Sequence, residues 1–307
     1  MPSGNETVLH EVTREQGSLL VQLTLGPRPG SGVALYGTGL SGGAHGFGTI
    51  VRATRSGVVS VLYNFADYGT IGWSPIGGLS NVNGTFYGTT RSGGAGSGGT
   101  VFSVTPSGSV SLVYAFRGGA DGDLPEASPV SLNGTLYGTT YYGGTANFGT
   151  VYSLTPSGSE EVLYSFQGGN SDGANPTTGL IAVNGTLYGT TEYGGRYSGG
   201  TVFSITPSGS ETILHSFNCV VDGCSPAAAL LAFNGKMYGT TTSGGNSNDG
   251  TVFSVTPSGT ERVLHAFTGG SDGATPRGGL INVRRTLYGT TSSGGTYDDG
   301  TVYSVTL

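Results

Sequence analysis

Charged residues are scarce in this sequence. Asp, Glu, Lys and Arg together make up 10% of the 307 residues, lysine occurs once, at Lys236, and the formal net charge at pH 7 is -6. A nucleic-acid-binding protein needs a basic face to neutralise phosphates, so this composition argues against a nucleic-acid partner. Long apolar runs are missing too, since none approaches the roughly 20 residues that span a bilayer. We therefore expect no membrane partner.

Several recognisable motifs are also missing. The first residues, Met-Pro-Ser-Gly-Asn-Glu, contain neither a basic nor an apolar stretch, so we expect no signal peptide in this sequence. The location is left open between the cytoplasm and export with a leader removed. No nucleophile elbow, phosphate loop or dinucleotide fingerprint occurs, and the glycine-rich segments join strand to strand. We therefore expect no cofactor.

Cysteine and histidine are rare. Cys219 and Cys224 flank Val-Val-Asp-Gly, and a turn there would bring their Cα atoms within the roughly 7 Å that a disulfide requires. Two reduced thiols are the alternative. No second cysteine pair exists to complete a zinc site. Three of the four histidines stand where tyrosine stands in other copies of the repeat described next, which indicates a structural role: His10, His215 and His265.

Glycine, by contrast, is abundant, with 60 residues, and its positions are periodic. Six variants of Leu-Tyr-Gly-Thr-Thr recur at intervals of 50 or 51 residues. A fixed period of this length indicates a fold that is built by repetition. The tyrosines of the six copies are Tyr36, Tyr87, Tyr137, Tyr188, Tyr238 and Tyr288.

Each copy predicts four short strands, which we call a, b, c and d. Asn184-Gly185 separates the first two in one copy, and Asn-Gly between apolar runs indicates a type I′ hairpin turn. Alternating apolar and β-branched residues favour strands in the segments that follow. No helical period of useful length occurs, so we predict an all-β protein. In that copy the expected strands are 179–183, 186–191, 201–206 and 211–217.

Four antiparallel strands in about 50 residues describe one blade of a β-propeller. The sequence begins with a strand d, Glu6–His10, and ends with a strand c, Thr301–Thr306, so the N-terminal strand is expected to join the last blade and close the ring. We predict one six-bladed β-propeller domain over residues 1–307, and a monomer. A β-solenoid is the structural alternative. The repeats run approximately over 6–57, 58–108, 109–158, 159–209, 210–259 and 260–307.

The repeat resembles the GloVer (Gloeo/Verruco) tandem repeat of bacterial proteins that are often exported. The matching segments in one copy are Asp172–Pro176, Leu187–Thr191, Gly194-Gly195 and Gly200–Ser204. The resemblance extends over essentially the whole chain from residue 6 onward. It implies a propeller-like fold, and it implies no activity, because function depends on sites that are added to a fold.

The connections between strands differ in how much they vary. The a–b turns (Asn-Gly) and the c–d turns (Pro-Ser-Gly) are short and nearly invariant, whereas the b–c and d–a loops are longer and change from copy to copy. In a four-stranded meander these two groups emerge on opposite faces. Scaffolds place ligand sites on the face that carries elaborate loops. We therefore predict a site on the face of the b–c and d–a loops, which we call the loop face.

The composition of these loops suits a carbohydrate or another polyhydroxylated small molecule. Aromatic rings offer flat apolar surfaces for stacking, and nearby charged groups offer hydrogen-bond partners for hydroxyls. Tyrosines that merely cover neighbouring loops are the alternative interpretation. The predicted ligand-binding residues are Arg14, Tyr68, Trp73, Arg91, Tyr141, Tyr142, Tyr193, Arg196, Tyr197 and Tyr297.

An enzyme is the second functional hypothesis. A lyase, hydrolase, isomerase or cyclase would draw an acid–base pair from the same loops, since propellers carry such chemistry on added sites. A structural or protein-interaction role is a third hypothesis. The candidate catalytic residues are Glu15, Asp67, Glu192, Asp298 and His45.

The d–a loops recur as Asp-Gly-x-x-Pro in four copies. We interpret them as turns in which the aspartate caps its own backbone. We expect no metal, and calcium is an alternative for one copy, where Asp121, Asp123 and Glu126 are clustered oxygen ligands.

The first two d–a loops depart from this pattern. Thr13–Ser18 has neither Asp-Gly nor proline, Ala66–Pro75 carries the single tryptophan, and Gly39 replaces a repeat threonine nearby. These departures direct attention to the first two repeats, although neutral drift at a chain end would produce them too.

Overall fold

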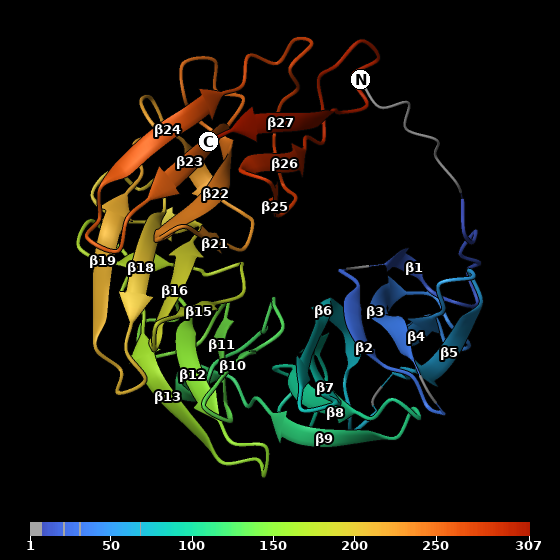
Figure 1. Ribbon diagram of the computed structural model, residues 1–307. Helices are drawn as coiled ribbons and strands as arrows, with labels where there is room; N and C mark the ends of the chain where they lie inside the picture. Colours follow the sequence, from blue (N-terminus) through green and yellow to red (C-terminus); the bar gives the residue numbers. More distant parts are fainter. Residues whose placement is uncertain (1–7, 21, 31, 68) are drawn as a thin grey trace. The chain divides into compact units, whose positions relative to one another are not determined.

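The computed structural model describes residues 8–20, 22–30, 32–67 and 69–307 (Figure 1). It divides into two compact units, one of residues 1–117 with 127–129 and one of residues 118–126 with 130–307. Nearly all regular structure in the described ranges is antiparallel β-sheet, and the exception is a single 3-10 turn at Gly119–Asp121. The predicted all-β class is therefore confirmed. Within these ranges, no helix has the length and apolar character that a membrane crossing requires.

The first unit contains two antiparallel sheets. In the first sheet, β3 pairs with both β1 and β2 and then with β4, which pairs with β5; in the second, β6 to β9 pair in chain order. The strands are β1 (Ser18–Leu20), β2 (Thr24–Pro27), β3 (Val33–Ser41), β4 (Thr49–Ala53), β5 (Val59–Asn64), β6 (Trp73–Val82), β7 (Thr85–Ser92), β8 (Thr100–Val104) and β9 (Val110–Ala115).

The second unit contains four larger sheets and one small one. The larger sheets are β10–β13, β15–β16–β18–β19, β20–β24 and β25–β27, and the small one pairs β14 with β17. The strands of the first two larger sheets and the small one are β10 (Val130–Leu132), β11 (Thr135–Thr140), β12 (Thr150–Leu154), β13 (Glu160–Ser165), β14 (Gly173–Ala174), β15 (Ile181–Val183), β16 (Thr186–Thr191), β17 (Tyr193–Gly194), β18 (Thr201–Ile205) and β19 (Glu211–Ser216). The others are β20 (Cys224–Pro226), β21 (Leu231–Phe233), β22 (Lys236–Ser243), β23 (Thr251–Val255), β24 (Glu261–Ala266), β25 (Ile281–Val283), β26 (Thr286–Thr290) and β27 (Val302–Thr306).

The sheet β15–β16–β18–β19 shows how one repeat folds, and Figure 1 shows its strands side by side. The four strands lie where the sequence predicted strands a to d. Asn184 and Gly185 both have positive φ, 51° and 82°, as a type I′ turn requires, so Val183 pairs with Thr186 across the hairpin. The predicted strand order and turn are therefore confirmed for this repeat.

The core lies between consecutive sheets. In the second unit, Tyr188 and Phe217 of one sheet form a buried cluster with Leu230 and Phe253 of the next. Because an isolated sheet of this kind exposes both faces, burial against its neighbours supplies the stability that the short strands lack. Five of the six repeat tyrosines are at most 7% exposed, and these buried members are Tyr36, Tyr87, Tyr137, Tyr188 and Tyr238.

Threonine pairs join strand b to strand c at the loop face. The hydroxyls of Thr191 and Thr201 lie 2.8 Å apart, and both residues are fully buried. The same bond recurs in four further sheets. In the first sheet Gly39 stands opposite Thr49, so the pair is missing there. Thr49 keeps the bond to the d–a loop that other strand-c threonines also make, donating to the carbonyl of Gln16 at 2.8 Å.

The last sheet, β25–β26–β27, has three strands among the described residues. The predicted N-terminal strand Glu6–His10 falls partly on residues 1–7, outside the described residues, and positions 8–10 belong to no strand. Ring closure and the number of six blades therefore stay predictions at this point.

Candidate functional site

The b–c and d–a loops of a repeat interlock, as their shared face predicts. In the second unit, β14 of one d–a loop pairs with β17 of the following b–c loop. Isolated bridges join Asp123 to Tyr142 and Ala274 to Ser293 in the same way. The loop face therefore rests on backbone hydrogen bonds, and side chains on it are held by an ordered frame.

The Asp-Gly-x-x-Pro loops are turns capped by their aspartates. Asp172 accepts the backbone N–H of Gln167 at 2.6 Å, and Asp222 accepts that of Asn218 at 2.7 Å. This confirms the predicted turn role for these two aspartates. The first d–a loop uses Gln16 in place of aspartate, because its side chain accepts from Thr13 N at 3.0 Å and bonds His10 at 2.7 Å.

Asn175 links two consecutive repeats at the loop face. Its φ is 55°, it is buried, and its side-chain amide donates to the carbonyl of Tyr141 at 3.0 Å. Its own carbonyl accepts the N–H of Glu192 at 3.1 Å. Sequence reasoning missed Asn175, which occupies a variable position of the Asp-Gly-x-x-Pro motif. The local signal was the tolerance of asparagine for positive φ.

Asn175 brings together residues that the sequence had nominated separately. Tyr141 and Tyr142 follow β11, and their rings meet edge to face with centroids 4.6 Å apart. The Tyr141 hydroxyl lies 3.5 Å from Glu192 Oε2, the outer limit of a hydrogen bond. Interaction with the same glutamate, followed by burial, raises the pKa of the adjacent Tyr193. We call Tyr141, Tyr142, Glu192 and Tyr193 the tyrosine cluster.

The tyrosine cluster combines exposed rings with a carboxylate. Tyr142 is 39% exposed and Tyr193 is 45% exposed, while Tyr141 and Glu192 are half-buried. Burial, followed by the charge of Glu192, raises the pKa of Tyr141 to about 12. Smaller contributions come from Tyr193, Tyr142 and the nearby Glu126. The Tyr141 hydroxyl is therefore a neutral donor at any physiological pH, and it faces an acceptor.

The nominated residues of the first unit lie in loops of its two sheets. Trp73 is half-buried at the start of β6, and its ring meets Phe47 edge to face at 5.9 Å. Tyr68 lies outside the described residues. The other nominated residues of this unit are all exposed: Arg14, Glu15, His45, Asp67 and Arg91.

Two further groups of predicted site residues lie on b–c loops of the second unit: Arg196 and Tyr197 on the loop that carries Glu192 and Tyr193, and Tyr297 and Asp298 on the last b–c loop. The Arg196 guanidinium stacks over the Tyr197 ring at 5.5 Å, and both residues are exposed. Tyr297 is 86% exposed. Asp298 accepts the N–H of Gly294 at 2.7 Å, as Asn147 and Asn248 accept from the equivalent glycines in their loops. Asp298 thus has a turn-capping role, and a catalytic role for it stays untested.

Cys219 and Cys224 form a disulfide. It brackets the loop that carries Asp222, so it restricts the freedom of that aspartate. Among the described residues, one group of three potential metal ligands has its ligand atoms mutually within 4.8 Å, and it consists of His215, Asp222 and Glu261. Asp121, Asp123 and Glu126, the alternative calcium ligands of the sequence, form no such group there.

Sheets that repeat in this way, packed against one another through buried tyrosines, define a β-propeller type of repeat protein. The Gloeobacter/Verrucomicrobia repeat matches residues 1–200 and 182–307. The chain therefore belongs to this repeat family, as the resemblance in its sequence predicted. Among curated proteins, none matches the sequence significantly.

Solved structures with a similar fold include three hydrolase-type or neuraminidase-like proteins. A gluconolactonase from Xanthomonas campestris is 14% identical, with a TM-score of 0.52 over 89% of this chain and 82% of its own. A subtype N11 neuraminidase-like protein of A/flat-faced bat/Peru/033/2010 (H18N11) is 11% identical, with a TM-score of 0.50 over 99% and 91%. A puromycin hydrolase is 12% identical, with a TM-score of 0.50 over 88% of this chain and 42% of its own. At these identities the likeness shows a propeller-like fold alone.

Proposed function

We propose that the tyrosine cluster binds a carbohydrate or another polyhydroxylated small molecule on the loop face. The observation that carries this proposal is the gathering of tyrosines from loops of consecutive sheets around one carboxylate. The Tyr141 hydroxyl lies 3.5 Å from Glu192 Oε2, and the exposed ring of Tyr142 packs on Tyr141. The exposed Tyr193 follows Glu192 directly in the chain. A sugar ring presents an apolar face with hydroxyls at its edge. Tyr142 and Tyr193 offer surfaces for the apolar face, and Glu192 offers two acceptor oxygens for the hydroxyls.

The frame beneath the cluster supports this proposal. Asn175 fixes the backbones of Tyr141 and Glu192 from a buried position, so little conformational entropy is left to lose on binding. Exposed rings that only covered neighbouring loops would bury their faces instead. Both rings here keep more than a third of their surface in solvent.

A saturation-transfer NMR screen of neutral mono- and oligosaccharides tests the proposal. We expect Tyr142→Ala and Tyr193→Ala each to weaken binding of any saccharide hit by about five- to tenfold, since each lost ring contact is worth about 1 to 1.5 kcal/mol. Tyr297→Ala is the matched control, because that tyrosine is more exposed and lies outside the cluster. Equal losses in all three variants, or binding that survives both cluster variants, would contradict the proposal.

Catalysis at the same cluster is the second candidate function. It is favoured by the neutral Tyr141 hydroxyl, which lies 3.5 Å from Glu192 and whose pKa is raised further by the charge of Glu126. A carboxylate beside a tyrosine donor suits acid–base chemistry on a bound small molecule, of the hydrolase, lyase, isomerase or cyclase type. Glu192→Gln distinguishes the two functions. It would lower turnover of a saccharide hit by about 10²-fold or more while the hit still binds, whereas a pure binding site shows no turnover in either protein.

We further propose that the chain closes into a ring of six blades, with Glu6–His10 as the outer strand of the last one. Within the first unit, a side chain at Gly57 would collide with the carbonyl of Leu9. The glycines of later c–d turns lie in the same way against outer-strand leucines of preceding sheets, for example Gly209 against Leu163 of β13. Leu9 therefore has the surroundings of an outer-strand residue.

The last sheet supports closure from within the second unit. Val302 on β27 is 80% exposed, whereas its counterparts Val202 and Val252 are fully buried beneath an outer strand. An uncovered valine at a strand edge is the feature that a missing fourth strand leaves behind. The sequence Glu6-Thr-Val-Leu-His10 is identical to Glu211-Thr-Ile-Leu-His215 of β19 at four of five positions, with Val8 in place of Ile213.

A further inference from the structure

Three potential ligands from two consecutive sheets meet in the second unit, away from the tyrosine cluster. His215 lies on β19, Asp222 lies in the loop that follows it, and Glu261 begins β24 of the next sheet. His215 Nε2 lies 3.0 Å from Asp222 Oδ2, and the ligand atoms of all three residues lie within 4.8 Å of one another. Tetrahedral coordination with bonds of about 2.0 to 2.1 Å places ligand atoms about 3.3 Å apart, so small shifts would close the group around one ion.

His215 and Asp222 are held in place from several sides. The second carboxylate oxygen of Asp222 accepts the N–H of Asn218 at 2.7 Å, which leaves Oδ2 for the histidine. The His215 ring packs edge to face on the buried Phe217 at 4.9 Å. The disulfide between Cys219 and Cys224 closes the loop around Asp222. Two of the three ligands are therefore pre-organised before any ion arrives.

Glu261 supplies a further observation. Its Oε1 atom is buried and has no hydrogen-bond partner, although the glutamate lies beside His215 and Asp222; the equivalent atom of Glu211 is also without a partner, but no histidine lies beside it among the described residues. A buried carboxylate oxygen without a partner is costly, because it has lost its water without gaining a replacement. A cation between the three residues would provide that replacement.

We propose that His215, Asp222 and Glu261 bind a divalent transition-metal ion of the zinc class. Nε2 and one oxygen from each carboxylate are its protein ligands, and water completes the coordination. One imidazole with two carboxylates suits zinc and its neighbours in the first transition row, whereas calcium and magnesium prefer oxygen ligands throughout. On binding, the ion takes the place of the hydrogen bond between His215 and Asp222.

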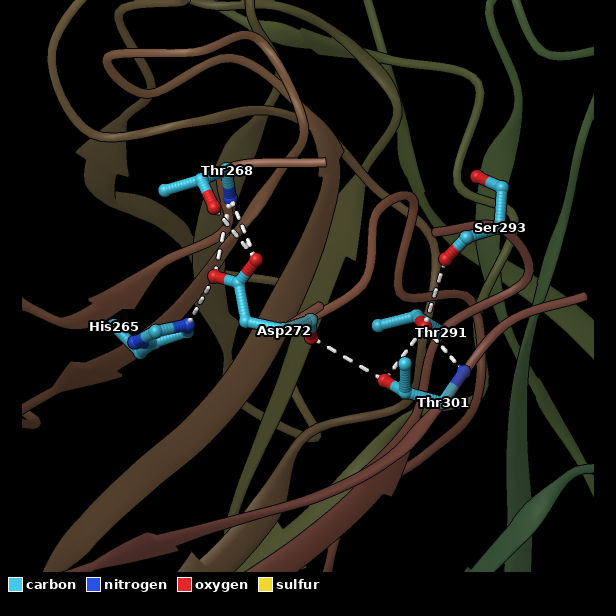
Figure 2. Close-up of polar contacts among 6 residues, drawn as sticks. All are labelled: His265, Thr268, Asp272, Thr291, Ser293 and Thr301. Atoms are coloured by element: carbon cyan, nitrogen blue, oxygen red, sulfur yellow. Dashed lines mark hydrogen bonds and ion pairs between the residues drawn. The ribbon is translucent and has the colours of Figure 1, made fainter. Parts of the chain in front are cut away.

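The repeat contains related groups that differ by one ligand. In the preceding pair of sheets Tyr164 replaces the histidine, and its hydroxyl lies 3.0 Å from Asp172 Oδ2, beside Glu211. A neutral tyrosine is a poor zinc ligand, so this group is a natural negative control. In the following sheet His265 lies 3.2 Å from Asp272, whose carboxylate is shared with Thr268 in Figure 2. No third carboxylate joins that pair among the described residues.

Titration calorimetry with zinc chloride, on the full chain after chelator treatment, tests the proposal. We expect one zinc ion per wild-type chain and a loss of affinity of roughly 100-fold or more in His215→Tyr, which places a natural alternative residue of the repeat at that position. Tyr164→His should gain a second site, raising the stoichiometry to two. His45→Ala removes an exposed loop histidine and should leave one site unchanged.

The proposal depends on which variants lose zinc affinity. Wild-type chain that binds no zinc, or zinc binding that is equal in His215→Tyr and wild type, overturns it. A loss in His45→Ala equal to that in His215→Tyr also overturns it, because such a loss indicates adventitious binding to any histidine. If His215→Tyr fails to fold by circular dichroism, then Glu261→Gln takes its place. The same loss of affinity is expected in Glu261→Gln, and affinity retained there overturns the proposal.

Discussion

Glu211 shows how a single buried carboxyl group couples stability to pH. Burial, followed by the charge of Asp172, raises the pKa of Glu211 to about 7, well above the ordinary value for a glutamate. Between that ordinary value and about pH 7 the folded chain binds more protons at this position than the unfolded chain does. The free energy of unfolding therefore falls as the pH rises through this window, and the contribution of the protonated group is lost above about pH 7.

Glu211→Gln is expected to remove this dependence, because glutamine is neutral and has similar size. At pH 8 the variant should be more stable than wild type by about 1 kcal/mol, a figure reduced from the full shift because the group is partly exposed. Urea denaturation at intervals between about pH 4 and about pH 8 measures the free energy of unfolding of both proteins. Glu161→Gln on the exposed face of β13 is the control. If the free energy of unfolding of the wild type changes with pH in the same way as that of Glu211→Gln, then Glu211 is not the group responsible.

At the scale of one sheet, the buried threonine pairs tie strand b to strand c where the loop face begins. Thr191 accepts from Thr201 N at 3.2 Å, bonds its hydroxyl and donates to the carbonyl of Tyr193 at 2.9 Å. The last bond orients the residue after Glu192. The pair therefore supports both the strand and the entry to the tyrosine cluster.

Thr191→Val keeps the shape of the side chain and removes its hydrogen bonds. We expect a loss of about 1 to 3 kcal/mol, because the Thr201 hydroxyl loses a partner inside the core. Thr186→Val on the same strand is the control, since Thr186 is half-buried at the far end of β16. Chemical denaturation of both variants measures their free energies of unfolding. Similar losses in the two variants would show that the threonine pair contributes no more than an ordinary strand residue.

The disulfide is a second device at the scale of one element. Cys219 and Cys224 are five positions apart, so the closed loop is small and the chain-entropy gain is modest, about 2 kcal/mol. A Cys219→Ser, Cys224→Ser double variant should lose that amount. In reductant, the free energy of unfolding of the wild-type protein should fall to about that of the variant. The free energy of unfolding of the variant itself should not change with reductant. A reductant effect of equal size on the double variant would exclude the disulfide as its cause.

Local patterns predicted the scaffold well, and long-range contacts limited the prediction of the site. Asn184-Gly185 and the repeat tyrosines depend on neighbours within a few residues, so their roles are readable from the sequence. The contact between Tyr141 and Glu192 joins residues from different repeats, and it depends on Asn175, a variable loop position. Glu261 likewise meets His215 only because two sheets pack together.

At the scale of the whole molecule, the proposed closure is tested by a cross-link. Ser204 pairs with Thr212, so the matching sequence places Thr7 opposite Ser304. Cysteines at both positions should form an intramolecular disulfide under oxidation, visible by mass spectrometry, with a gain of several degrees in Tm. Cysteines at Thr7 and Ser254, the equivalent position one sheet earlier, should not pair. Equal cross-linking in both variants, or in neither, would contradict closure.

The uncovered edge at Val302 has a consequence for association. Under the proposed closure, the N-terminal strand that completes its own last sheet would fit the last sheet of a second copy equally well, because the two edges are identical. In the proposed ring, tethering would give the chain's own N-terminal strand an effective concentration near the millimolar range. Exchange between copies therefore becomes competitive only as the protein itself is concentrated toward that range, and the exchanged species would be a domain-swapped dimer with native-like blades.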